Sequence, residues 1–191
     1  MNSFLETIKS ADGEILNLSY HQKRYESVLN SFGVSEYENL SEYLNPPQDG
    51  IFRCRLVYDV DSINVTYHSY EKKNISSLKL IFSDIDYSKK STNRDELNLL
   101  YGERESCDDI LIVKDSFITD TSIANIAIFS DGIWKTPLIP LLKGTTRDRL
   151  LDDGILIEAN IGVEELKESS NIALMNAMID FYILDECEIL I

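Results

Sequence analysis

The segment Tyr87-Ser88-Lys89-Lys90-Ser91-Thr92-Asn93-Arg94 marks a change of pattern along the chain. A strand-like apolar run precedes it, and a helix-like run with Leu97, Leu100 and Tyr101 on one face follows it. We therefore expect a hinge near residues 83–90, between a small α+β domain over 1–86 and a second domain over 87–191. Two adjacent lysines before a helix are usually a solvated surface. Lys90 therefore indicates a functional site only together with other residues.

The first half is expected to open with a hairpin. Asp12-Gly13 is a strong two-residue turn signal between strands over 4–9 and 14–17. A helix is expected from an N-cap at Ser19 to Phe32, where Gly33 ends it. The remaining elements expected here are a short helix over 36–44 and strands over 52–60, 63–70 and 78–82.

The second half has many short strands with interspersed helices, which predicts a compact, barrel-like α+β domain. Asp115-Ser116 and Asp131-Gly132 are expected to form tight turns. The expected helices cover 94–104, 145–153 and 164–167, and the expected strands cover 110–114, 117–119, 125–129, 133–136, 155–160, 172–175 and 181–184.

Composition excludes several classes of protein. The net charge of −15 over 191 residues argues against general nucleic-acid binding and against docking on anionic membranes. No apolar run approaches the roughly 18–20 residues of a membrane helix, and the N-terminus has no signal-peptide pattern, so we expect a cytoplasmic protein. The three cysteines form no Cys-x-x-Cys pair, and two histidines exclude a metal site with three or more histidines.

Three kinds of functional group follow one another in the sequence: the amine of Lys90, the carboxylate of Asp120 and the hydroxyls of Thr145 and Thr146. Pyridoxal phosphate (PLP) needs a lysine that forms a Schiff base, an acid for its ring nitrogen and a cradle for its phosphate. The threonines stand at a predicted helix start, where free amides and the helix dipole favour an anion. Each residue alone also has a simpler interpretation, as a surface charge, a turn cap or a helix cap.

Five motifs occur once each, in this order along the chain: His21-x-x-Arg24; Tyr87-x-x-Lys90-x-x-x-Arg94; Thr119-Asp120-Thr121-Ser122-x-x-Asn125; Trp134-x-Thr136-Pro137 with Leu142-x-Gly144-Thr145-Thr146-Arg147; and Leu174-Met175-Asn176-Ala177-Met178. Together they resemble the class IV (fold-type IV) PLP-dependent enzymes. That family includes branched-chain and D-amino-acid aminotransferases and 4-amino-4-deoxychorismate lyase. The resemblance implies a D-amino-acid aminotransferase-like fold, with a small α/β N-terminal domain and a pseudobarrel C-terminal domain.

The resemblance also implies roles. Lys90 would be the Schiff-base lysine, with Lys89 as the alternative, and would move protons as general base and acid. Asp120 would hold the proton of the ring nitrogen, where the family more often has glutamate, and Asn125 would order its loop. His21 would support Arg24. The other residues implied to bind PLP, mostly at its phosphate, are Arg24, Arg94, Thr145, Thr146, Asn176 and Ala177.

Three activities stay open. The Asn176-Ala177 segment and the small size favour a lyase that releases pyruvate and p-aminobenzoate, as in folate biosynthesis. The alternatives are an amino-acid aminotransferase of the branched-chain or D-amino-acid type, and a catalytically silent homologue, because the chain is short for this family. The substrate would be a small amino compound with a carboxylate, which Arg53 or Arg55 could bind from one strand face. The family implies a homodimer.

Overall fold

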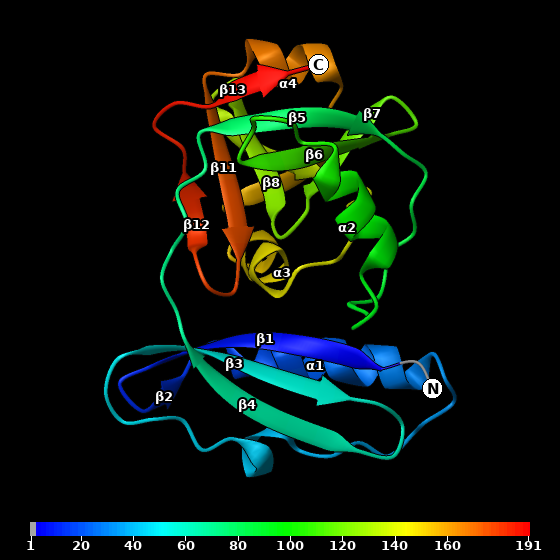
Figure 1. Cartoon of the computed structure of the whole chain (residues 1–191), viewed down its shortest axis with the longest axis vertical. Helices are drawn as coiled ribbons and strands as arrows, with labels where there is room; N and C mark the ends of the chain where they lie inside the picture. The colour runs from blue at the N-terminus through cyan, green and yellow to red at the C-terminus, as the bar shows by residue number, and fades with distance from the viewer. Residues whose placement is uncertain (1–2) are drawn as a thin grey trace. The chain divides into compact units, whose positions relative to one another are not determined.

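The computed structural model describes residues 3–191, and the chain divides into two compact units (Figure 1). The first unit contains the chain up to Lys72 together with Lys89–Asn93, and the second contains Lys73–Ser88 and Arg94–Ile191. The mixture of sheets with a few helices confirms the expected α+β class. No helix in the described part of the chain is long and apolar enough to cross a membrane.

The first unit is built on an antiparallel sheet in the order β2-β1-β3-β4. Asp12 and Gly13 both have positive φ (48° and 83°) in the turn between β1 and β2, which confirms the expected hairpin. The strands are β1 (Phe4–Ala11), β2 (Glu14–Ile15), β3 (Ile51–Tyr58) and β4 (Ile63–Ser69).

Helix α1 (Leu18–Asn30) packs on this sheet and closes the core of the first unit. Its apolar residues recur at helical spacing, so they share one face. The ring of Tyr25 meets the ring of Tyr58 edge-on, with centroids 4.9 Å apart. The buried members of this core are Phe4, Tyr25, Val28, Leu29, Leu40, Leu56 and Tyr58.

The segment Lys89–Asn93 returns to the first unit and runs beside β1. The Leu5 amide donates to the Lys90 carbonyl (2.9 Å), and the Thr92 amide donates to the Ser3 carbonyl (3.0 Å). An antiparallel bridge between Phe4 and Ser91 lies between these two hydrogen bonds. The Lys90 carbonyl and the backbone of the two residues after it are therefore fixed to the start of the chain, at Ser3 and the first residues of β1.

The second unit is built on a mixed sheet in the order β10-β9-β8-β7-β6-β5-β13, with β11 paired to β8 and to β12. Its helices are α2 (Asp95–Gly102), α3 (Thr145–Asp152) and α4 (Val163–Glu168). Its strands are β5 (Ser77–Phe82), β6 (Asp109–Lys114), β7 (Phe117–Thr121), β8 (Asn125–Ser130), β9 (Ile133–Pro137), β10 (Leu156–Ala159), β11 (Asn171–Asn176), β12 (Asp180–Ile183) and β13 (Glu188–Leu190).

Strand β6 is buried on both faces, because alternate side chains enter two different cores. Leu111 and Val113 join the main core, whereas Ile110 and Ile112 pack with Leu97 of α2. This explains why β6 is a continuous apolar run, as expected of a strand that is covered on both sides.

The structure departs from the sequence-based expectations in several places. Strand β5, expected in the first half, pairs in parallel with β6 and belongs to the second unit. The expected helix over 36–44 is only the short 3-10 helix η1 (Leu40–Tyr43). Helix α1 begins at Leu18 after Asn17, whose φ of 55° turns the chain, so Ser19 is not its cap. Strand β13 was not expected at all.

Candidate functional site

The first unit holds a buried cluster of charged side chains between β1 and α1. Glu6 of β1 has no solvent exposure, and it accepts a hydrogen bond from Nε of Arg24 (2.8 Å) and a second one from the same guanidinium group. His21 Nδ1 lies 2.6 Å from Glu6 Oε2. Burial alone would raise the pKa of Glu6, but Arg24 and His21 outweigh it and lower the pKa to about 2. Glu6 is therefore ionised.

Burial determines the protonation state of His21, and the Glu6 carboxylate determines which ring nitrogen carries the proton. Burial lowers the pKa of His21, against the opposing effect of Glu6, so the ring is neutral at pH 7. An ionised carboxylate can only accept hydrogen bonds, so Nδ1 of His21 carries a proton and donates a hydrogen bond to Glu6. Nε2 of His21 is buried and has no hydrogen-bond partner. His21 thus supports Arg24 through Glu6, which refines the expected role of the His-x-x-Arg motif.

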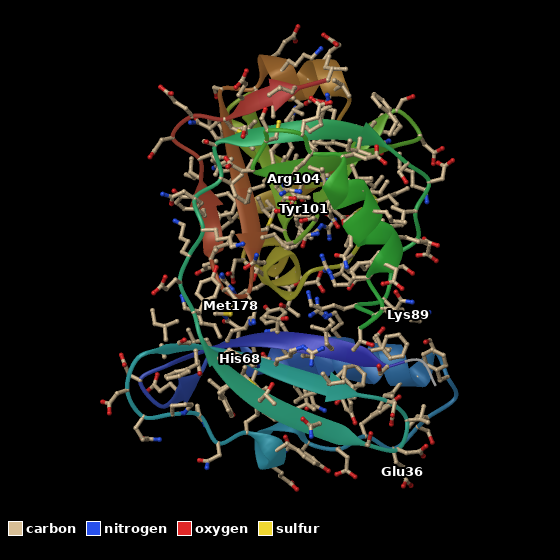
Figure 2. All side chains as sticks on the ribbon, viewed as in Figure 1. Glu36, His68, Lys89, Tyr101, Arg104 and Met178 are labelled. Carbon is tan, nitrogen blue, oxygen red and sulfur yellow. The ribbon has the colours of Figure 1, made fainter. Side chains whose placement is uncertain are left out.

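The two adjacent lysines, Lys89 and Lys90, have different surroundings. Lys89 Nζ lies 5.6 Å from the centroid of the Phe32 ring, a cation–π contact at the end of α1 (Figure 2). The positive charge of Lys90 instead contributes to lowering the pKa of His21, so Lys90 lies within electrostatic range of the Glu6 cluster. The Ser91 amide donates to the Lys89 carbonyl (2.7 Å), so Lys90 lies at the centre of a tight turn. Of the two lysines, Lys90 is the one whose charge acts on His21 in the cluster that contains Arg24.

In the second unit, Asp120 of β7 is buried and both of its oxygens accept hydrogen bonds. Asn125 Nδ2 donates to Oδ1 and the Leu142 amide donates to Oδ2, each at 2.7 Å. Burial raises the pKa of Asp120 to about 7, although these hydrogen bonds and the charge of Arg147 act to lower it. Asp120 is therefore an acid that can take up or release a proton near neutral pH.

Helix α3 begins immediately after the loop that contacts Asp120. Thr145 and Thr146 form its first turn and are both buried, and Gly144 precedes them in an extended conformation. Arg147 is buried as well, donating to the Pro137 carbonyl (2.8 Å) and to Glu158 (2.7 Å). The first amides of a helix have no partner within the helix, so this turn offers donors suited to a phosphate.

Arg94 and Asn176, expected to bind the cofactor, hold the chain that follows Asp120. Arg94 donates to the Ser122 carbonyl (2.8 Å) and lies over the Tyr87 ring. Asn176 donates to the Ile123 carbonyl (3.2 Å) and accepts from the amides of Met178 and Ile179. Figure 2 marks Met178 in the β11–β12 turn that Asn176 shapes, directly after Ala177.

Sequence reasoning missed two buried acids. Glu6 shares the inward face of β1 with Phe4 and Ile8, and this alternation was the available signal. Asp109 is buried at the start of β6, where burial raises its pKa and the hydroxyls of Ser122 and Thr121 act against it. Asp109 resembles its exposed neighbour Asp108 in sequence, so nothing distinguished it.

The remaining polar candidates lie on strands of the first unit. Arg53 and Arg55 lie on the face of β3 opposite to the buried Cys54 and Leu56. His68 is exposed on β4, beside Thr66 (3.1 Å) (Figure 2). Among the described residues, no cluster of His, Cys, Asp or Glu could hold a metal ion.

The predicted site residues are thus divided between the units. Arg24 and Lys90 belong to the first unit with Glu6 and His21, whereas Asp120, Asn125, Thr145 and Thr146 belong to the second. The donor set fits PLP chemically: a guanidinium group, a lysine, a buried acid with a near-neutral pKa, and a helix N-terminus.

Comparison with known proteins defines the family. The sequence model of class IV aminotransferases matches residues 3–186, so the chain belongs to the class IV aminotransferase family. Enzymes of this family depend on PLP. An uncharacterized protein from Haemophilus influenzae is 34% identical over 185 residues, covering 93% of this chain and 98% of its own length.

Solved structures agree with the fold. The crystal structure of a "putative 4-amino-4-deoxychorismate lyase" from Haemophilus somnus superposes with a TM-score of 0.86 at 34% identity, over 93% of this chain and 97% of that one. A "putative amino-acid aminotransferase" from Mesorhizobium loti gives a TM-score of 0.80 at 21% identity, with full coverage of both chains. Proteins of similar length with the same fold therefore exist.

Proposed function

We propose that the protein is a PLP-dependent enzyme that eliminates pyruvate from 4-amino-4-deoxychorismate and leaves p-aminobenzoate. The observation that carries PLP chemistry is the buried Asp120, which two hydrogen bonds hold in place and whose pKa lies near 7. The 34% identity to the Haemophilus somnus structure, whose name gives the lyase activity, supports this choice of reaction.

Each residue has a defined task in this proposal. Bound PLP supplies an electron sink for the bonds at the substrate α-carbon. Lys90 Nζ would attach the cofactor, take the proton from that carbon, and deliver a proton to the departing enolpyruvate, which becomes pyruvate as the ring becomes aromatic. Asp120 accepts the hydrogen bond of the protonated ring nitrogen, and its negative charge keeps that proton in place. Thr145, Thr146 and Arg24 bind the phosphate, with Glu6 orienting the Arg24 guanidinium group.

An amino-acid aminotransferase is the alternative, because the matching family is that of class IV aminotransferases and the Mesorhizobium loti structure is named a putative amino-acid aminotransferase. The two reactions differ in whether an acceptor keto acid is needed. We expect pyruvate and p-aminobenzoate from 4-amino-4-deoxychorismate without any keto acid. Amino transfer that strictly requires a keto acid, with no pyruvate released, would contradict the lyase activity and support the aminotransferase.

The PLP class is tested by absorbance. After incubation with PLP, we expect a band near roughly 410–430 nm that is retained in Lys89→Ala and lost in Lys90→Ala. Lys89→Ala is the matched control, because it removes the neighbouring amine. Absence of the band at saturating PLP would reject both enzyme activities and leave a silent homologue.

We further propose a cytoplasmic homodimer, as the family resemblance implies. Within the second unit, a cavity of about 200 Å³ is flanked by side chains of Phe117, Leu138 and Ile139. Ile139 is 75% exposed, and the other two are about 40% exposed, which supports contact with a second copy of the chain.

A further inference from the structure

We propose that Asn125 is a positioning residue that joins the acid at the cofactor ring to the helix at the cofactor phosphate, and that Gly144 is glycine to make room for it. The inference deepens the proposed function and rests on it. Asn125 would touch neither the substrate nor the cofactor. It would act through Asp120 on one side and through the start of α3 on the other.

The contacts of Asn125 form a closed arrangement within the second unit. Its Nδ2 atom donates to Asp120 Oδ1 (2.7 Å) and to the Leu142 carbonyl (2.8 Å). The Leu142 amide in turn donates to Asp120 Oδ2 (2.7 Å). A primary amide has two N–H groups, so both donors of Asn125 are used. The Asn125 side chain and the backbone of Leu142 are thus bonded to each other, and each also donates to one oxygen of the Asp120 carboxylate.

The other end of Asn125 lies against Gly144, the residue that precedes α3. A Cβ atom built on Gly144 would lie 1.9 Å from Asn125 Oδ1, far inside any tolerable contact. The φ of Gly144 is −77°, which any residue can adopt, so the glycine is needed for space and not for backbone freedom. The amide therefore fills the volume directly behind the first turn of the helix.

This arrangement would fix the spacing between two anchors of one ligand. The ring nitrogen and the phosphate of PLP are joined through a flat ring and a short linker, which confines the distance between them to a narrow range, so the protein gains affinity when both anchors are set before binding. Asn125 contacts Asp120 directly. It also packs against Gly144, which stands two residues before Thr146. Loss of the amide would leave both anchors present but no longer held at a common spacing.

A double-mutant cycle tests the packing of the pair. We expect Gly144→Ala to lower the urea midpoint of unfolding strongly in the wild-type background. In an Asn125→Ala background, where the obstructing amide is gone, the same substitution should cause a shift roughly threefold smaller. Equal shifts in both backgrounds would show that the two residues do not compete for space, and would overturn the packing part of the proposal.

Fragment binding tests the function of the pair. The dissociation constants of PLP, inorganic phosphate and pyridoxal are measured by fluorescence on the wild type, Asn125→Ser, Asn125→Asp and the exposed control Asn171→Ala. We expect the Asn125 variants to bind PLP about tenfold or more weakly, since a buried hydrogen bond is lost, while phosphate binding changes by no more than about twofold. Asn171→Ala should match the wild type.

The outcomes separate the two proposals. A wild type that binds PLP, together with Asn125 variants that bind it equally well, overturns the positioning role and leaves the proposed function intact. Equal losses for PLP and for phosphate also overturn it, because they indicate general damage to the fold around α3. A wild type that does not bind PLP rejects the proposed function and this inference with it.

Discussion

The carboxylate of Glu6 on β1 and the guanidinium group of Arg24 on α1 form a two-point ion pair in which Glu6 has no solvent exposure. An unpaired buried charge is costly, so each group depends on the other. The pair links the first strand to the helix that carries the expected phosphate-binding arginine. It therefore belongs both to the stability of the first unit and to the proposed site.

The Glu6 pair predicts an acid-sensitive stability. The pKa of Glu6 is about 2 in the folded chain and near 4.5 in the unfolded chain, so its stabilisation is complete above pH 4.5 and is lost as the pH falls toward 2. We expect the free energy of unfolding to decrease by roughly 3 kcal/mol across this window. Urea unfolding of wild type and Glu6→Gln at several pH values measures it, and an unchanged slope in the variant would contradict the assignment.

The raised pKa of Asp120 predicts that, near neutral pH, stability changes with pH in the opposite direction. Its pKa is raised from 3.8 to about 7, so the protein without cofactor binds a proton that the unfolded chain has released. Stability should therefore decrease as the pH rises from about 4 to about 7, by roughly 4 kcal/mol if the whole shift is realised. Asp120→Asn, which has no titrating group, should abolish this slope. A difference in stability between wild type and Asp120→Asn that stays constant across this range would contradict it.

The proposed role of Thr145 and Thr146 predicts that their hydroxyls contribute affinity only for ligands that carry the phosphate. Thr145→Val and Thr146→Val remove hydroxyls but keep the backbone amides of the first helical turn, so we expect PLP to bind roughly 3- to 10-fold more weakly. Pyridoxal, which has no phosphate, should bind these variants as it binds the wild type. Equal weakening of both ligands, measured by fluorescence titration, would show that the hydroxyls do not act on the phosphate.

The exposed apolar side chains of the second unit predict the site of self-association. Ile139→Asp places a charge at a side chain that is 75% exposed and should be harmless to a monomer. We expect sedimentation to show a dimer for the wild type and a shift toward monomer for the variant. Ile157→Asp, also on an exposed apolar position of the second unit, serves as the control. A wild type that sediments only as a monomer would reject the homodimer.

Local patterns predicted most elements of this fold. The Asp12-Gly13 turn, the helical spacing that includes Tyr25 and Val28, and the buried run of β6 each carry their information within a few residues. The placement of β5 could not be predicted in the same way, because it depends on pairing with β6 about thirty residues later. Short β13 follows acidic residues and has too little alternation to be detected.

The candidate site shows the same limit. Motif order made Lys90, Asp120 and Asn125 candidates, but it could not separate the contacts of Lys89 and Lys90, because the contact of Lys89 depends on the position of Phe32. Glu6 was missed because an acid in a strand is ordinarily exposed, and its burial becomes favourable only when Arg24 and His21 pack on it from α1.

The identity of the PLP-bearing residue tests the central claim most directly. The protein is incubated with PLP, reduced with borohydride, digested and examined by mass spectrometry for the lysine that carries the phosphopyridoxyl group. We predict the adduct on Lys90, with none on Lys89 and none in Lys90→Ala. A reduced adduct on Lys89 or on another lysine, or no adduct on the wild type, would contradict the account.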